Sequence, residues 1–291
     1  MVLTSVIALA GLGLAAAALL AMASKVFAVP EDPRVEKICD TLPGANCGGC
    51  GYAGCEGYAV AVVNDESVSP NLCVVGGPQC AAAIGELTGK LTAEMEPLRV
   101  YRRCDKNHGK VQRRFDYQGI SSCAAVAALH RGADQCKYSC LGFGDCVKVC
   151  SFDGLYLMDG VAKVNSQVCT GCGSCVKACP RGVLELIPKR AKVAISCSTQ
   201  DKGKAVMDVC SVGCIHCSKC VKLCPAKAIS MQGSKIVIDH MACLNYEGDC
   251  EQACAKGCPR GIIHRRHVVQ PAAVEAPAAE APAPENSQPA A

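Results

Sequence analysis

Two cysteine runs constrain the structure of this chain more than any other feature of its sequence. Residues 169–180 and 214–225 both follow the pattern C-x2-C-x2-C-x3-C-P. Thiolates at this spacing are typical ligands of [4Fe–4S] clusters, where three thiolates of a run hold one cluster and the fourth crosses to a second cluster. Zinc is the alternative, because paired cysteines also bind zinc, but four cysteines followed by proline are not its usual pattern.

The composition agrees with a metal protein. The chain has 291 residues, of which 26 are cysteine, four are phenylalanine and none is tryptophan. This cysteine density is typical of disulfide scaffolds or metal sites, and a chain of this length should not need disulfides in place of a core. There are 30 Lys and Arg residues against 26 Asp and Glu, with no long basic run, so we expect no nucleic acid among its partners.

Each complete run needs a partner run. Residues 136–150 carry four cysteines, but Phe143 stands where the middle cysteine of an ordinary run would be, and we expect Cys136 to replace it. Residues 243–259 have a longer loop and keep the C-x3-C-P ending. The crossed pattern of bacterial ferredoxins then predicts four clusters. Their predicted ligands are Cys136, Cys140, Cys146 and Cys179; Cys150, Cys169, Cys172 and Cys175; Cys214, Cys217, Cys220 and Cys258; and Cys224, Cys243, Cys250 and Cys254.

These paired runs belong to an internal repeat. Cys104, followed shortly by Gly-Lys, matches Cys197 in a similar setting with one residue of slippage. Residues 179–183, CPRGV, match residues 258–262, CPRGI. A duplicated module explains both matches.

Hairpin signals lie between the half-motifs. Residues 155–158 and 161–164 flank Asp159-Gly160, a pair typical of a type I′ turn. Residues 229–231 and 236–238 flank a second short loop. Together with the cysteine runs, they predict two ferredoxin-like modules of short helices and paired strands.

Residues 46–55, NCGGCGYAGC, carry a different cysteine motif. Cys47, Cys50 and Cys55 follow C-x2-C-x4-C, and Cys73 supplies a distant fourth thiolate. The glycines between them let backbone N–H groups approach cluster sulfurs. The spacing predicts a fifth [4Fe–4S] cluster, with zinc as the alternative.

Residues 2–24 contain no charged side chain. A helix of this length, at about 1.5 Å per residue, crosses a hydrocarbon core of about 30 Å. The first charge is Lys25, so the positive-inside rule places the N-terminus outside and the remainder in the cytoplasm. A cleaved signal peptide is the alternative, but the charged n-region is missing and the apolar run is too long. Cytoplasmic cysteines stay reduced, which favours metal ligands over disulfides.

The predicted fold class is α+β, in a single-pass protein of the cytoplasmic membrane. We expect a transmembrane anchor at 1–26, a small [4Fe–4S] domain at 33–92, and tandem 2[4Fe–4S] ferredoxin-like modules at 98–190 and 191–267. Residues 268–291 are rich in alanine and proline without a hydrophobic period, which predicts a disordered tail.

Residues 42–55, LPGANCGGCGYAGC, behind one apolar N-terminal helix, resemble the B subunit of the Rnf complex. Residues 140–146 and 202–206 resemble longer versions of that protein, and the resemblance covers about residues 1–265. It implies a membrane complex that moves electrons between reduced ferredoxin and NAD, coupled to Na⁺ or H⁺ transport, with ferredoxin delivering electrons to this chain. The family's first cluster falls on Cys47, Cys50, Cys55 and Cys73, although Val74-Val75 stand where the family usually has a proline.

Five sets of four leave six of the 26 cysteines, namely Cys39, Cys80, Cys104, Cys123, Cys197 and Cys210. The repeat relates Cys104 to Cys197, and it relates Cys136, not Cys123, to Cys210. We hypothesise a sixth cluster held by Cys104, Cys123, Cys197 and Cys210; buried free thiols are the alternative. The predicted cofactors are therefore five [4Fe–4S] clusters, or six.

Other features have ordinary interpretations. The basic residues between Arg99 and Arg114 are expected to form a solvated face, and the alternative is a surface that receives an acidic ferredoxin. Gly142-Phe-Gly144 lacks the third glycine and the strand–helix context of a dinucleotide fingerprint, so no nicotinamide or flavin site is expected.

The sequence therefore predicts a membrane-anchored electron carrier without catalytic residues of its own. By resemblance, it is a component of a ferredoxin:NAD oxidoreductase and translocase, with soluble ferredoxin and other membrane subunits as partners. The alternative is an electron-transfer subunit of another membrane-bound hydrogenase or reductase. A third interpretation, a cysteine-rich binding or structural protein, would be excluded by bound iron.

Overall fold

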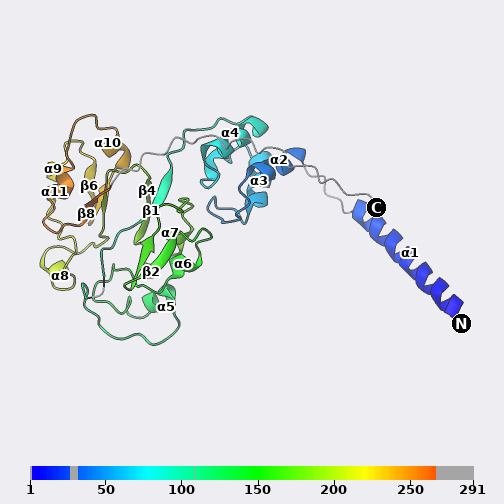
Figure 1. Cartoon of the computed structure of the whole chain (residues 1–291), viewed down its shortest axis with the longest axis horizontal. Coiled ribbons are helices and arrows are strands. Elements are labelled where there is room, and N and C mark those ends of the chain that lie inside the picture. Colours follow the sequence, from blue (N-terminus) through cyan, green and yellow to red (C-terminus); the bar gives the residue numbers. More distant parts are fainter. Residues whose placement is uncertain (1, 27–31, 108, 267–291) are drawn as a thin grey trace, which may run out of the picture. The chain divides into compact units, whose positions relative to one another are not determined.

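The computed structural model describes residues 2–26, 32–107 and 109–266 (Figure 1). The chain divides between Met95 and Glu96 into two compact units, residues 1–95 and residues 96–291. The tail predicted at 268–291 lies outside the described residues.

The first unit begins with helix α1 (Val2–Val26). Large apolar side chains are exposed along it, and Leu12, Leu14 and Leu20 have 72%, 74% and 72% of their surface accessible. Within the described ranges, α1 is the one helix long and apolar enough to cross a membrane. An apolar surface of this extent is unusual in water, whereas it matches the hydrocarbon core of a bilayer.

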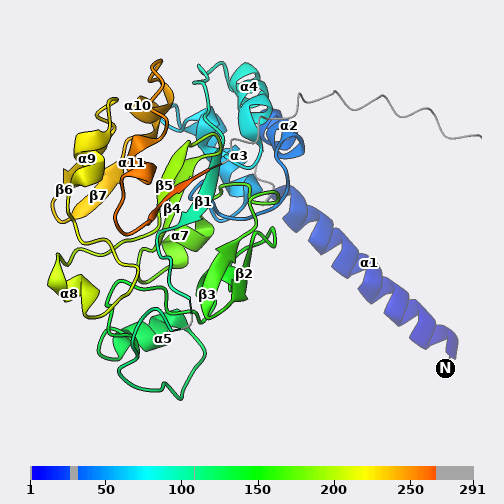
Figure 2. The ribbon, with the colours of Figure 1, turned by 60° about the vertical axis from the view of Figure 1, so that its left-hand side comes forward.

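The remaining helices of the first unit enclose a small apolar core. They are α2 (Pro33–Thr41), α3 (Cys55–Asn64), the 3₁₀ turn η1 (Pro70–Leu72) and α4 (Gly77–Thr88), and Figure 2 shows α2, α3 and α4 as neighbours. Ile38, Tyr58, Val62 and Ile84 are almost completely buried between them. The local sequence starts α2, because Asp32 accepts the Arg34 N–H at 2.9 Å and proline occupies the first turn.

Polar side chains fix the loop that leads from α3 to η1. The Tyr58 hydroxyl donates to the Ser69 carbonyl at 2.9 Å. Lys90 Nζ donates to the carbonyls of Val62, Asp65 and Val68 at 2.7, 2.6 and 2.9 Å. Because these carbonyls end α3 and begin the loop, the lysine satisfies acceptors that the helix leaves unpaired.

The second unit repeats one arrangement of strands and helices. In its first half, β1 (Leu98–Arg102) pairs antiparallel with β4 (Leu184–Pro188) and β2 (Leu155–Met158) with β3 (Val161–Val164), beside α5 (Cys123–Ala128), α6 (Asp145–Lys148) and α7 (Ser174–Ala178). In its second half, β5 (Val193–Ile195) pairs with β8 (Ile263–Arg265) and β6 (Ile229–Gln232) with β7 (Lys235–Ile238), beside α8 (Lys204–Met207), α9 (Lys219–Leu223), α10 (His240–Leu244) and α11 (Ala253–Lys256). The strand pairs follow the same order in both halves, as a repeat requires.

The hairpin predicted around Asp159-Gly160 is confirmed. Both residues have positive φ, 53° and 67°, as a type I′ turn demands, and Met158 pairs with Val161. The second hairpin is tighter than predicted, because Gln232 pairs with Lys235 and only two residues remain in its loop.

Equivalent segments of the two halves, at and just after the ends of β1 and β5, meet at a seam. Cys104 and Cys197 form an antiparallel bridge, and Tyr101 Oη lies 2.5 Å from Ser196 Oγ. Arg103 is buried and donates to the carbonyls of Cys197 and Ile236 at 3.2 and 2.6 Å. Sequence-distant cysteines are therefore brought near one another at this seam.

Candidate iron–sulfur centres

Four cysteines of the second repeat line one cavity. Cys214 and Cys217 come from the loop before α9, Cys220 from α9 itself, and Cys258 from the Cys-Pro before β8. The other walls are largely aliphatic, with Ile195, Ile215, Ile236, Ile262 and Ile263. These are the four thiols that the crossed pattern assigns to one cluster, and the structure brings them together.

The first repeat has a closely matched cavity. Cys140, Cys146 and Cys179 line it at positions equivalent to those above, but the fourth cysteine is Cys123. Cys136, which the sequence assigned to this set, does not line it. The structure therefore places Cys123 where the prediction has Cys136.

The packing of α5 explains this exchange. Cys123 begins α5, where it packs with Val126 and Leu141, and Phe143 lies against the same group. The Asp145 carboxylate ties the start of α5 to α6, because it accepts from the Ser122 hydroxyl at 2.9 Å and the Ala124 N–H at 3.0 Å. Helix α5 thus delivers a thiol where the loop carries Phe143. No local spacing signals this, since Cys123 lies outside the run.

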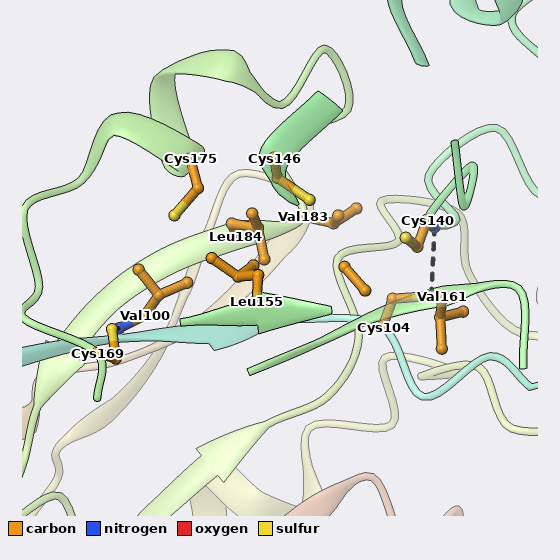
Figure 3. Packing of buried hydrophobic residues seen from close by; sticks show 11 residues of the cluster. Val100, Cys104, Cys140, Cys146, Leu155, Val161, Cys169, Cys175, Val183 and Leu184 are labelled. Atoms are coloured by element: carbon orange, nitrogen blue, oxygen red, sulfur yellow. Dashed lines mark hydrogen bonds between the residues drawn. The ribbon is translucent and has the colours of Figure 1, made fainter. Parts of the chain in front are cut away.

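The thiols of two further predicted sets also lie close together. Burial raises the pKa of the Cys175 thiol to about 12, with smaller contributions from four nearby thiols, namely Cys172, Cys169, Cys146 and Cys150. Burial likewise raises the pKa of Cys254 to about 11, helped by Cys224, Cys243 and Cys250. Such thiols are protonated at neutral pH without metal, so cluster binding must displace their protons. Figure 3 shows Cys175 and Cys146 on neighbouring helices beside Leu155 and Leu184.

Cys136 lies at the seam instead. Burial raises its pKa to about 11, against a backbone hydrogen bond at Tyr138 that lowers it, and the nearby thiols of Cys210 and Cys197 also raise it. Cys104, across the bridge from Cys197, accepts the Cys140 N–H at 3.4 Å, and Cys197 accepts the Cys214 N–H at 3.3 Å. The hypothesised sixth set had Cys123 with Cys104, Cys197 and Cys210; the structure puts Cys136 with the last two. The repeat, which relates Cys136 to Cys210, was the signal for this placement.

The first unit gathers its cysteines on the apolar core. Cys50, Cys55 and Cys73 pack there with Cys39 and Cys80. The Cys55 N–H donates to Asn46 Oδ1 at 2.8 Å, and the Gly76 N–H donates to Cys73 Sγ at 3.4 Å. The Cys80 thiol also hydrogen-bonds Cys73 and lowers the Cys73 pKa to about 6. Cys47 lies partly exposed in the same glycine-rich loop.

The chemistry of these donors fits [4Fe–4S] clusters. Within the described parts of the chain, no three His, Cys, Asp or Glu side chains converge closely enough to hold a single metal ion. In the two matched cavities the four thiols instead surround a volume with largely apolar walls. Four thiolates around a largely apolar enclosure are the ligand arrangement of a cubane.

The prediction that the basic residues between Arg99 and Arg114 form a solvated face is wrong for three of them. Arg99, Arg103 and Lys106 are 8%, 2% and 9% exposed. Arg103 pairs with Glu185 at 3.0 Å, and Lys106 pairs with Asp134. These residues belong to β1 and the seam, which the two repeats cover, so their burial follows from tertiary packing.

Comparison with known proteins gives independent evidence on the same segments. Residues 42–75 match a family described as "Putative Fe-S cluster", and residues 168–229 and 213–265 match families described as 4Fe-4S dicluster domains. The chain is 46% identical over 253 residues to the B subunit of the proton-translocating ferredoxin:NAD(+) oxidoreductase complex of Clostridium ljungdahlii, a match that covers 87% of this chain and 88% of the relative. The chain belongs to the Rnf family of ion-translocating oxidoreductase B subunits. The family predicted from residues 42–55 is thereby confirmed.

Two other members of the Rnf B-subunit family match over similar lengths. The B subunit of the ion-translocating oxidoreductase complex of Methanosarcina acetivorans is 40% identical over 265 residues, covering 91% of this chain and 98% of the relative. The B subunit of the Na(+)-translocating ferredoxin:NAD(+) oxidoreductase complex of Acetobacterium woodii is 38% identical over 246 residues, covering 84% and 73%. The matched dicluster domains confirm [4Fe–4S] clusters as the class of cofactor.

Proposed function

We propose that this chain is the iron–sulfur electron-transfer subunit of a membrane-bound ion-translocating complex. In this role it accepts electrons from reduced ferredoxin and passes them toward NAD reduction, coupled to Na⁺ or H⁺ transport. The names of the relatives from C. ljungdahlii and A. woodii support this reaction. The observation that carries the proposal is the pair of matched cavities, each lined by four cysteines. A [4Fe–4S] cluster bound in each would supply one-electron transfer.

The placement of the cysteines leads us to assign six clusters. The thiols that approach one another define the sets. One set, which lies at the seam, takes two cysteines from each repeat. The proposed ligands are Cys47, Cys50, Cys55 and Cys73; Cys123, Cys140, Cys146 and Cys179; Cys150, Cys169, Cys172 and Cys175; Cys214, Cys217, Cys220 and Cys258; Cys224, Cys243, Cys250 and Cys254; and Cys104, Cys136, Cys197 and Cys210.

The proposed organisation follows from the same sites. Residues 1–26 anchor the chain as a single-pass helix with the N-terminus outside, and residues 33–92 form the first [4Fe–4S] domain in the cytoplasm. Residues 98–190 and 191–267 form the two ferredoxin-like modules. The exposed apolar surface of α1 and the Lys25 charge at its end support this topology.

Iron analysis of paired cysteine variants tests the ligand assignment. Protein purified without oxygen should hold about 24 irons with six clusters and about 20 with five, at four irons each. If Cys123 and Cys146 hold the same cluster, the double variant C123A/C146A loses no more iron than C146A alone. The variant C136A/C146A should lose twice as much. Equal loss from C136A/C146A and C146A would restore Cys136 to the cavity set and refute the new assignment.

Membrane vesicles test the function. Inverted vesicles from cells lacking this protein should show no NAD reduction with reduced ferredoxin, and the wild-type chain should restore it. The variant C258A, which removes one thiol from the second cavity, should assemble in the membrane without restoring the rate. Full ferredoxin:NAD activity in vesicles without the protein would refute the proposal.

A further inference from the structure

A buried arginine of β1 has no protein counter-charge. Arg99 is 8% exposed, and its Nε makes no hydrogen bond. Among the described residues, no carboxylate forms an ion pair with it. A buried charge is strongly destabilising unless it is paired, so this position requires negative charge from another source.

A second arginine makes the requirement stronger. Arg266 lies over the Tyr101 ring, with Cζ 5.3 Å from the ring centroid, and one of its terminal nitrogens is also buried without a partner. Burial, together with the nearby charge of Arg99, lowers the Arg266 pKa to about 10. Two like charges therefore lie near each other, and Arg266 also borders an open cavity that admits water.

The loop that carries Cys169 packs directly on β1 beside Arg99. The Val100 N–H donates to Cys169 Sγ at 3.5 Å. A Cβ atom placed on Gly171 would lie 2.4 Å from the Leu98 carbonyl oxygen, so nothing separates loop from strand. Cys169 is also the thiol whose charge interacts favourably with Arg99. The missing negative charge is therefore that of the cluster held by this loop, since four thiolates leave such a cluster anionic.

The second repeat has a weaker version of the same arrangement. Lys192 stands five residues before Cys197, as Arg99 stands five before Cys104, and it interacts with the thiol of Cys243. Lys192 is only partly buried and lines an open cavity at the surface. Water screens its charge, whereas Arg99 acts through protein of lower dielectric.

We propose that Arg99 raises the reduction potential of the cluster held by Cys150, Cys169, Cys172 and Cys175 above that of the equivalent cluster beside Lys192. Reduction adds one electron and one negative charge to the cluster, and a fixed positive charge nearby stabilises that reduced form. An electron shared between these two clusters then resides mainly on the one beside Arg99. This inference rests on the proposed cluster sites, and it gives the order of these two clusters in potential.

Redox titration followed by low-temperature electron paramagnetic resonance tests the inference on the loaded protein. The signals are assigned by their loss in C169A and C243A. In the wild type, the signal lost in C169A should have the higher midpoint potential. Arg99→Gln should lower that potential by at least about 59 mV, which corresponds to a tenfold loss in the equilibrium constant for one-electron reduction. Arg99→Lys, which keeps the charge, should restore most of it, and Lys192→Gln should shift the other signal less.

Arg190→Gln is the matched control, because Arg190 is exposed and pairs with Glu96 on the surface of the same unit. It should shift neither signal. Equal potentials or the reverse order in the wild type would overturn the inference without any variant. An Arg99→Gln protein with full iron and unchanged potential would also overturn it. Absence of bound clusters would instead refute the proposed function, so the two failures are distinct.

Discussion

Breaking the buried ion pair between Lys106 and Asp134 should cause a large loss of stability. Both side chains are almost completely buried, at 10% and 5% exposure, and their charged groups are in direct contact. Lys106 Nζ also donates to the Cys140 carbonyl at 3.1 Å, and the Ser139 hydroxyl donates to Asp134 at 2.6 Å. The pair therefore holds the segment between two proposed ligands, Cys136 and Cys140.

Asp134→Ala should lower the free energy of unfolding by about 3–5 kcal/mol, because it leaves the Lys106 charge buried and unpaired. The exposed pair Arg190–Glu96 supplies the control, since Glu96→Ala should cost about 0–1 kcal/mol. The double replacement Lys106→Met/Asp134→Leu should recover most of the loss, because it removes both charges.

Denaturant unfolding of the cluster-loaded protein without oxygen measures these differences. Circular dichroism reports the fold, and the visible absorbance of the clusters reports their retention. If Asp134→Ala were no more destabilising than Glu96→Ala, or if the double replacement were worse than the single, the reasoning from burial would be wrong.

Three smaller contacts give further predictions. Gly171→Ala should lose about four irons, because Gly171 has positive φ and an added methyl group would collide with the Leu98 carbonyl oxygen. Gly173 also has positive φ, but a methyl group there would meet only the Leu186 side chain, so Gly173→Ala should keep more iron. Cys80→Ala should lower the potential of the first-unit cluster by removing a hydrogen bond to Cys73, and Cys80→Ser should restore part of it in the same titration. Burial lowers the His240 pKa in the folded chain, so the unfolded chain binds the proton more readily. The free energy of unfolding should therefore decrease as the pH is lowered through about 6.5. In unfolding curves measured across this range, His240→Phe should reduce the dependence on pH.

Much of the site could be predicted because cysteine spacing is a local property. In the second repeat, the three loop cysteines and Cys258 line one cavity as the crossed pattern predicts. The type I′ turn at Asp159-Gly160 was equally local, since both residues tolerate positive φ. Where a run is complete, its chain geometry alone places three thiols around one point.

The first repeat shows where local reasoning ends. Its loop carries Phe143 in place of a cysteine, and two candidates, Cys123 and Cys136, could replace the missing thiol. Cys136, the one nearer in sequence, does not line the cavity, because α5 packs on Leu141 and brings Cys123 to it. The internal repeat, which relates Cys136 to Cys210, predicts the position of Cys136 better than the spacing within its own run.

The sequence by itself determined the class of cofactor, the internal repeat and the apolar N-terminal helix, because each depends on spacing within a short segment. Only the tertiary structure decided which distant cysteine lines the cavity of the first repeat and that Arg99 and Lys106 are buried. The physical reason is the seam, where β1 is covered by residues far along the chain. Burial there converts basic side chains that look solvated in sequence into charges that need a partner.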